Sequence, residues 1–180
     1  YDKNREFVLT TSPSMDILIS SNLERLIYLI CGEDSEKTKE LMEELKTTGK
    51  YTITPEMKEK LADFAAGYST EEETAESIHD TYQKTGYVMD THTAVAAHVC
   101  GQYRAKSGDQ TKCVIASTAS PYKFVKSVMS AIDAENANAD EFDLLPKLQE
   151  VSGVPMPQAI KDILDAIDRF VYFENRKNNS

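Results

Sequence analysis

The chain has 180 residues, of which 41% are hydrophobic and 28% charged, and its formal net charge is −10. This composition predicts a soluble chain with a sizeable core, and the acidic balance argues against nucleic acid or an anionic membrane as a partner, because both need a basic surface. No apolar run approaches the roughly 20 residues of a membrane-spanning helix.

The three cysteines, Cys31, Cys100 and Cys113, are widely spaced in the sequence. Their odd number and spacing fit buried free thiols in a reducing cytoplasm better than a disulfide scaffold or a zinc site. We therefore expect a cytoplasmic protein without a metal site. The chain begins at Tyr1 rather than at a methionine, which suggests a piece of a longer protein.

Residues 5–10 predict a strand that ends in the polar turn Thr11–Asp16. A helix should follow, with Ser21 and Glu24 as a capping box and Gly32 as its end.

Arg25 lies in the first turn of this helix, where a cation is unfavourable for the helix dipole. Its position indicates either a salt bridge to Asp16, which we favour, or contact with an anion. Asn22 beside it has the same two interpretations.

Residues 33–86 are charged and carry apolar side chains at helical spacing. Ser69 and Glu72 predict a second capping box, for a helix that ends at Gly86. The acidic run Glu71–Glu73 falls in the first turn of that helix, where a solvated face explains it without a metal ion.

Strand signals return at residues 87–89 and again at Cys113–Ala116. The first run ends in Asp90–Thr93 and leads into a helix lasting to about Lys106. The second ends in the hydroxyl-rich turn Ser117–Ser120, after which Ser120 and Pro121 should start another helix. Beyond it the pattern predicts a short helix limited by Pro146 and a final amphipathic helix over residues 160–167.

Three predicted strands therefore end in polar turns, and parallel neighbours would bring these turns to one edge of a sheet. Such an edge is where open α/β sheets bind ligands, although many α/β corners bind nothing. His92, in the second turn, could donate to a phosphate or carboxylate or act as an acid or base, or it could only structure the turn.

Four segments, REFVLTTSPSMDILISSNLERLIYLICG, FAAGYSTEEET, GYVMDTHTAVAAHV and VIASTASPYKF, occur in this order. Together they resemble the C-terminal half of threonine synthases, from Tyr1 to about Ala131. That family uses pyridoxal 5'-phosphate to convert O-phosphohomoserine and water to threonine and phosphate.

The resemblance implies an α/β fragment of a three-layer, fold type II pyridoxal enzyme, with a few mostly parallel strands flanked by helices. Residues 1–18 and 87–132 would belong to the cofactor-binding domain, residues 19–86 would form a helical insertion, and residues 133–180 a C-terminal helical segment.

The family's Schiff-base lysine and phosphate-binding loop would lie upstream of this chain. We therefore expect no catalytic residue in the fragment, which should be inactive alone and without bound cofactor. The resemblance assigns Thr118, with Ser117 as its competitor, to the pyridine nitrogen of the cofactor. It also implies substrate contacts, for which the candidates are Ser14, Asp16, Asn22, Arg25, His92 and Lys123.

Two other functions stay open at this point. One is another fold type II lyase, such as a serine/threonine dehydratase. The other is a non-catalytic domain that binds a phosphorylated ligand or a protein. If the chain is a fragment of a threonine synthase, a sheet cut from its upstream strands would expose an edge and invite self-association.

Overall fold

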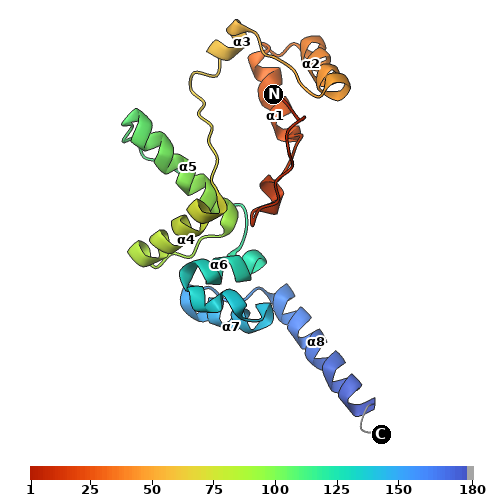
Figure 1. Ribbon diagram of the computed structural model, residues 1–180, viewed down its shortest axis with the longest axis vertical. Coiled ribbons are helices and arrows are strands. Elements are labelled where there is room, and N and C mark those ends of the chain that lie inside the picture. The colour runs from red at the N-terminus through yellow and green to blue at the C-terminus, as the bar shows by residue number, and fades with distance from the viewer. Residues whose placement is uncertain (178–180) are drawn as a thin grey trace.

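The computed structural model describes residues 1–177, most of which are helical. The elements are η1 (Pro13–Met15), α1 (Ser21–Ile30), α2 (Ser35–Thr48), α3 (Pro55–Glu59), α4 (Glu71–Thr85), α5 (Thr91–Ser107), η2 (Pro121–Phe124), α6 (Val125–Ile132), η3 (Ala134–Asn138), α7 (Glu141–Ser152) and α8 (Gln158–Lys177). Figure 1 shows α1–α3 at one end of the molecule, α4–α7 in the middle, and α8 running away from them.

The predicted parallel strands are not found among residues 1–177. Residues 5–10, 87–89 and 113–116 are irregular, and the described chain contains one isolated antiparallel bridge, between Asp2 and Lys50. A strand needs a neighbour to take up its backbone hydrogen bonds. Short runs of apolar residues favour an extended chain, but in the described structure these three segments do not supply one another with that neighbour.

A first hydrophobic cluster joins α1, α2 and α3 through six buried side chains: Ile27, Ile30, Leu41, Leu45, Tyr51 and Met57. The N-terminal residues close over it, since the Tyr1 ring stacks on Tyr51 with centroids 5.5 Å apart. Gly49 turns the chain at the end of α2 with φ of +84°, a conformation that side chains rarely adopt.

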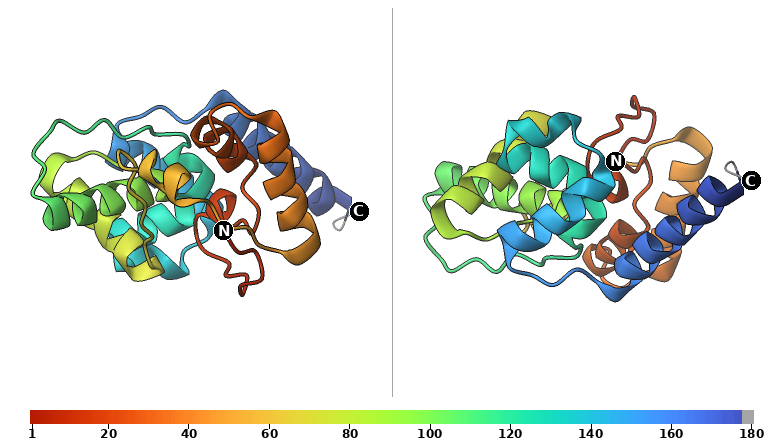
Figure 2. Two further views of the ribbon diagram at one scale, coloured as in Figure 1. Left: turned by 90° about the horizontal axis from the view of Figure 1, so that it is seen from above. Right: turned by 90° about the horizontal axis from the view of Figure 1, so that it is seen from below.

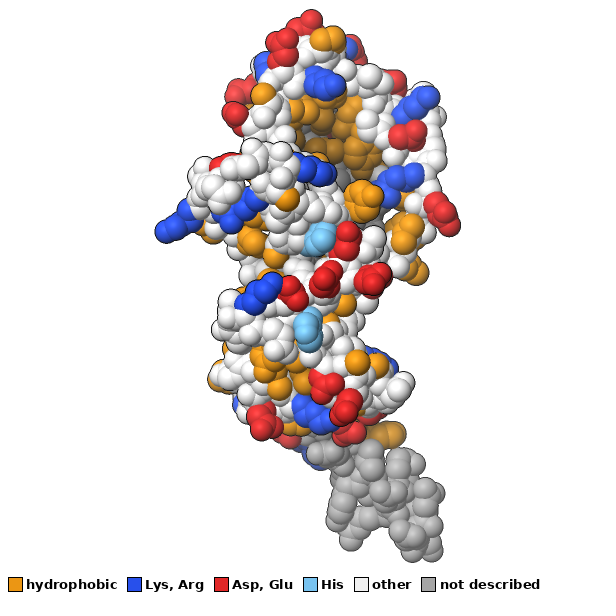
Figure 3. All heavy atoms as spheres, turned by 60° about the vertical axis from the view of Figure 1, so that its left-hand side comes forward, with side chains coloured by type: hydrophobic (Ala, Val, Ile, Leu, Met, Phe, Trp, Pro, Cys, Tyr) orange, Lys and Arg blue, Asp and Glu red, His pale blue; other side chains and the backbone are white. Residues whose placement is uncertain are grey.

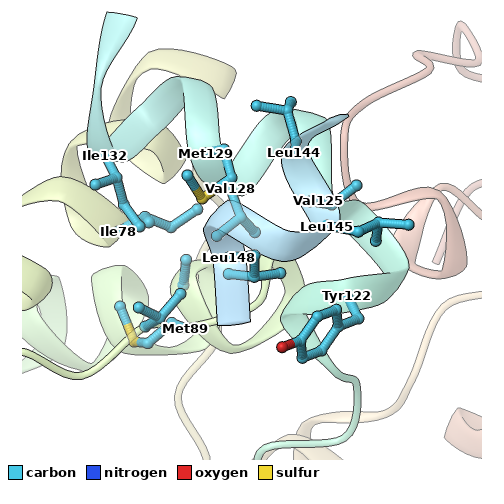
Figure 4. Close-up of a cluster of buried hydrophobic side chains, with 12 residues drawn as sticks. Ile78, Met89, Tyr122, Val125, Val128, Met129, Ile132, Leu144, Leu145 and Leu148 are labelled. Atoms are coloured by element: carbon cyan, nitrogen blue, oxygen red, sulfur yellow. The ribbon is translucent and has the colours of Figure 1, made fainter. Parts of the chain in front are cut away.

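A second, larger cluster joins α4, α5, α6 and α7 (Figure 4). Its centre consists of Val125, Val128, Leu144 and Leu148, whose side chains are completely buried. Residues 87–89, although not a strand, contribute Val88 and Met89 to this cluster.

Pro146 lies inside α7 instead of limiting it, so this prediction is wrong. Proline in a helix interior removes one hydrogen bond and costs about 3 kcal/mol. Burial of Leu144, Leu145 and Leu148 from the same helix offsets this cost, because each buried leucine contributes about 1.5–3 kcal/mol.

The predicted helix starts are close to the observed ones but not all correct. α1 is preceded by Ser20, with no side-chain cap, so the expected Ser21–Glu24 capping box is wrong. The box of α4 is shifted by one residue: the Thr70 hydroxyl accepts from the Glu73 N–H, and the Glu73 carboxylate accepts from the Thr70 N–H.

Apolar side chains remain on the surface along the segments predicted as strands. Phe7, Val8 and Leu9 are 49%, 61% and 76% exposed, and Val114 is 88% exposed. Figure 3 shows hydrophobic side chains open to one face of the half that contains α1–α3. None of the helices within residues 1–177 has the length and apolarity needed to cross a membrane.

The predicted division into residues 1–18 with 87–132, residues 19–86, and residues 133–180 stays a prediction. The hydrophobic clusters divide the chain differently. Helix α4, which falls within residues 19–86, packs in the same cluster as α5 and α6.

Candidate functional site

The candidate site is centred on Asp90, the N-cap of α5, which is 1% exposed. Its carboxylate accepts the Thr93 N–H at 3.1 Å and the Thr93 hydroxyl at 2.5 Å. Asp and Asn are common at the N-cap because their side-chain oxygen accepts a hydrogen bond from a free backbone N–H at the helix start. Asp90 therefore fixes both the first turn of α5 and the orientation of the Thr93 side chain.

Hydrogen bonds join all three polar turns at this helix start. The Thr91 hydroxyl donates to the backbone carbonyl of Thr11 at 2.9 Å, and the Thr93 hydroxyl lies 3.0 Å from that of Ser117. The Ser117 hydroxyl also reaches the Asp90 carboxylate, at 3.4 Å. Turns separated by 80 and 24 residues in the sequence thus meet at one point without a sheet between them.

Ser117 and Thr118 differ in how their hydroxyls are used. Both residues are exposed. The Ser117 hydroxyl is engaged with Thr93 and Asp90, whereas no hydrogen bond of the Thr118 side chain is found among residues 1–177. Thr118 is therefore the one of the pair whose hydroxyl is available to a ligand.

His92 is buried beside this junction, and its Nε2 atom has no hydrogen-bond partner among the described residues. Its ring meets the Phe124 ring edge to face, with centroids 4.8 Å apart. The Lys123 ammonium lies 5.3 Å from the centroid of the same Phe124 ring. Lys123 and His92 are thus linked through Phe124, a residue that the sequence pattern did not single out for the site.

The first turn is closed by Asp16 and not by a contact with Arg25. Both Asp16 carboxylate oxygens accept from Thr10, one from its N–H and one from its hydroxyl, each at 2.7 Å. Ser14 is exposed in the 3-10 turn beside it. The favoured salt bridge from Arg25 to Asp16 is wrong, because among the described residues the Asp16 carboxylate binds Thr10 and the Arg25 guanidinium binds Asn22.

Asn22 and Arg25 lie on α1, and the hydrogen bonds that join the three turns do not include them. The Arg25 guanidinium donates to the Asn22 amide oxygen at 3.3 Å. Arg25 also lines a cleft of about 590 Å³ between α1 and α2, together with Lys39 and Glu43. The structure thus separates these two predicted substrate residues from the junction of turns.

Glu71 belongs to this region, although the sequence predicted a merely solvated face for it. Its carboxylate accepts the Thr11 N–H at 3.1 and 3.2 Å and so fastens the first turn to α4. Glu71, Thr11, Thr91 and Lys126 line a cavity of about 400 Å³. Nothing in the local pattern reveals this contact, because its partners are 60 residues apart.

The first polar turn, Thr11–Asp16, contains a second buried polar atom without a hydrogen-bond partner, in addition to His92 Nε2. The Ser12 hydroxyl, one residue after Thr11, makes no hydrogen bond within residues 1–177 and is almost completely buried. The described residues contain no group of three or more His, Cys, Asp or Glu side chains arranged to hold a metal ion.

A sequence profile described as "Threonine synthase, C-terminal" matches residues 93–179. The human protein "Threonine synthase-like 1" is 35% identical over 157 residues, which are 86% of this chain and 21% of that protein. Threonine synthase of Saccharomyces cerevisiae is 35% identical over 162 residues, which are 82% of this chain and 32% of that enzyme. The chain thus spans between about a fifth and a third of the length of these relatives.

Two solved structures are similar in fold. Yeast threonine synthase superposes with a TM-score of 0.69 and 31% identity, over 93% of this chain and 37% of that one. The Brucella melitensis threonine synthase structure, which has PLP bound, gives a TM-score of 0.64 and 40% identity over 71% of this chain and 27% of that one.

Sequence and fold both match threonine synthases, and the part of those enzymes that this chain matches is their C-terminal portion.

The described residues fit one contact of pyridoxal phosphate, the cofactor in the Brucella structure. The cofactor's pyridine nitrogen needs a single hydrogen-bonding group. The Thr118 hydroxyl is exposed, carries no internal hydrogen bond, and follows a residue that Thr93 and Asp90 hold in place. These features agree with a group that holds one atom of a ligand.

Proposed function

We propose that the chain is the C-terminal part of a threonine synthase of the fold type II pyridoxal enzymes. In its full-length form the protein would convert O-phosphohomoserine and water to threonine and phosphate. The match to the C-terminal family profile, together with the junction of three polar turns around Asp90, supports this assignment. A serine/threonine dehydratase or a non-catalytic domain is not favoured, because the matching relatives are threonine synthases and threonine synthase-like proteins.

Pyridoxal phosphate, when bound, supplies an electron sink for carbanion chemistry, and the protein orients it and tunes its electronics. In this proposal the Thr118 hydroxyl hydrogen-bonds the pyridine nitrogen. A carboxylate there would keep the nitrogen protonated and strengthen the sink, whereas a neutral hydroxyl tempers it. Ser117 serves as the anchor, because its hydroxyl is bound to Thr93 and Asp90.

Substrate recognition is proposed for the remaining candidates in two groups. His92 and Lys123 lie next to the junction, where a cation or an N–H donor suits the substrate's phosphate or carboxylate. Ser14 and Asp16 shape the first turn, and Asn22 with Arg25 would reach the substrate only through the cleft beside α1.

The chain on its own is proposed to be inactive. The Schiff-base lysine and the loop for the cofactor phosphate would belong to a preceding part of the protein. We expect no saturable absorption band when pyridoxal phosphate is added to the isolated chain, and a band abolished by replacing one lysine would contradict this. A cytoplasmic location is proposed from the cysteine content of the sequence. The expectation that the thiols are buried is wrong, because Cys113 is exposed and Cys31 and Cys100 are only partly buried.

The deciding experiment uses the full-length gene product and measures phosphate release together with the cofactor's absorption spectrum. Thr118→Ala should retain the cofactor but lose at least tenfold in rate, and Thr118→Asp should shift the spectrum. Thr111→Ala, in the same exposed segment, serves as the control with unchanged rate. A wild-type rate for Thr118→Ala would move the assignment to Ser117, and a coding sequence without an upstream lysine region would contradict the enzyme.

A further inference from the structure

Two cysteines that are thirteen positions apart in the sequence meet at the surface of α5. The Cys100 thiol lies 3.1 Å from the Cys113 sulfur. Cys100 is half-buried on the helix, and Cys113 is exposed in the irregular segment that follows it. Figure 2 shows this segment as a loop between α5 and α6. Cys31 is elsewhere, in the first cluster, with its sulfur 3.9 Å from that of Met57.

The approach of the two sulfur atoms is held by hydrogen bonds just before Cys113. The Arg104 guanidinium donates to the Thr111 carbonyl at 2.6 Å, and the Tyr103 hydroxyl donates to the Asp109 carboxylate at 3.2 Å. Arg104 lies one helical turn after Cys100, on the same face of α5. These bonds therefore hold the segment before Cys113 against the face of α5 that contains Cys100.

A disulfide requires an S–S distance of about 2.05 Å, so the sulfur atoms need to move together by about 1 Å. The exposed Cys113 side chain belongs to a segment with no helix or strand bonds, which leaves it room for this adjustment. Neither cysteine is part of the junction around Asp90.

We propose that Cys100 and Cys113 are a redox-sensitive pair that forms an intramolecular disulfide when a low-molecular-weight disulfide, such as glutathione disulfide, is supplied. The Cys113 thiolate attacks one sulfur of glutathione disulfide and expels a glutathione thiolate. The Cys100 thiolate then attacks the Cys113 sulfur of the mixed disulfide and expels the second glutathione. Two protein thiols are oxidised, one glutathione disulfide is reduced to two glutathiones, and these take up the two protons released by the cysteines.

The order of the two steps follows from the positions of the thiols. The hydrogen bond that Cys100 donates to Cys113 raises the pKa of the Cys100 thiol, and burial adds to this effect. Cys100 therefore stays protonated longer and acts second, while the accessible Cys113 meets the oxidant first.

Oxidation would add a covalent bond to the hydrogen bonds that already hold this segment on α5. Ser117, four residues after Cys113, is already bound to Thr93 at the start of the same helix. A bond between Cys100 and Cys113 would close the loop of residues 101–112 and restrain the path to Thr118.

The test incubates the chain at graded ratios of oxidised to reduced glutathione, followed by acid quenching, alkylation and mass spectrometry. We expect the intact mass to fall by two hydrogens and two of the three thiols to disappear. Trypsin should yield one linked species joining residues 85–104 and 113–123, with Cys31 alkylated. Excess dithiothreitol should restore all three thiols.

Three serine variants separate this pair from general thiol reactivity. Cys100→Ser should accumulate glutathione on Cys113, Cys113→Ser should form no internal disulfide, and Cys31→Ser should oxidise like the wild type. Stable glutathione adducts on both Cys100 and Cys113, a disulfide that includes Cys31, or only intermolecular dimers would overturn the proposal. Arg104→Ala should slow closure several-fold, and an unchanged rate would contradict the proposed role of the Thr111 contact.

Discussion

Asp90→Ala tests whether the junction of three turns contributes to the stability of the second cluster. The variant removes the cap of α5 and the carboxylate that Thr93 and Ser117 contact. Helix α5 packs on α4 within that cluster, so loss of its first turn should be measurable as a change in the free energy of unfolding.

The expected magnitude combines two effects. Loss of an N-cap costs about 1 kcal/mol. Hydrogen bonds to a charged group contribute about 1.5–3 kcal/mol, which is offset in part because the buried carboxylate no longer has to be desolvated. We therefore expect Asp90→Ala to lower the free energy of unfolding by about 2–3 kcal/mol.

Asp140→Ala is the matched control. Asp140 caps α7 in the same cluster by accepting the Phe142 N–H at 2.9 Å, but it is exposed. Its replacement should cost only about 1 kcal/mol. Asp90→Asn, which keeps the cap and an acceptor oxygen, should cost about 1 kcal/mol or less by the same reasoning.

The assay is urea unfolding followed by circular dichroism at pH 7, with linear extrapolation to water. The reasoning would be refuted if Asp90→Ala and Asp140→Ala cost the same, because the contacts to Thr93 and Ser117 would then add nothing beyond a cap.

Three further predictions concern the core, acid stability and association. Leu148 is completely buried, so Leu148→Ala should lower the free energy of unfolding by about 2–5 kcal/mol in the same assay, and a loss below about 1 kcal/mol would contradict its central place. The hydrogen bond from the Thr70 N–H to the Glu73 carboxylate lowers the pKa of Glu73. The stability that this bond contributes is therefore complete above the ordinary pKa of 4.5 and disappears as the pH falls through the lowered pKa. Glu73→Gln should therefore flatten the pH dependence of stability on the acid side of pH 4.5, and an unchanged slope measured by denaturation would count against it. Val8 and Val114 are 61% and 88% exposed, so the isolated chain should elute from a size-exclusion column above its monomer size at high concentration. The double variant Val8→Lys with Val114→Lys should reduce this association. A monomeric wild type would contradict the predicted self-association.

Local chemistry was enough to predict most helices of this chain. Gly86 ends α4 with φ of +73°, and Ser120 begins η2 by accepting the Tyr122 N–H, as both residues predict. Both signals act within a few residues, and so they can be read without knowing the fold. The resemblance to threonine synthases likewise rested on local segments, and the family comparisons confirmed it.

The predicted strands were not found among residues 1–177, for the opposite reason. Phe7–Leu9 and Val114 have the apolar pattern of strands, but a strand depends on the backbone of another segment. Pro146 was read as a helix end because the pattern does not show that the leucines around it are buried.

The sequence by itself determined the helix ends at Gly49 and Gly86, the apolar faces of most helices, and the resemblance to threonine synthases. Only the tertiary structure decided that Thr11, Asp90 and Ser117 meet, that Thr10 rather than Arg25 binds Asp16, and that Cys100 faces Cys113. The physical reason is that side-chain pairing depends on how helices pack through a shared core. Sequence separation carries no information about which distant polar groups that packing brings within hydrogen-bond distance.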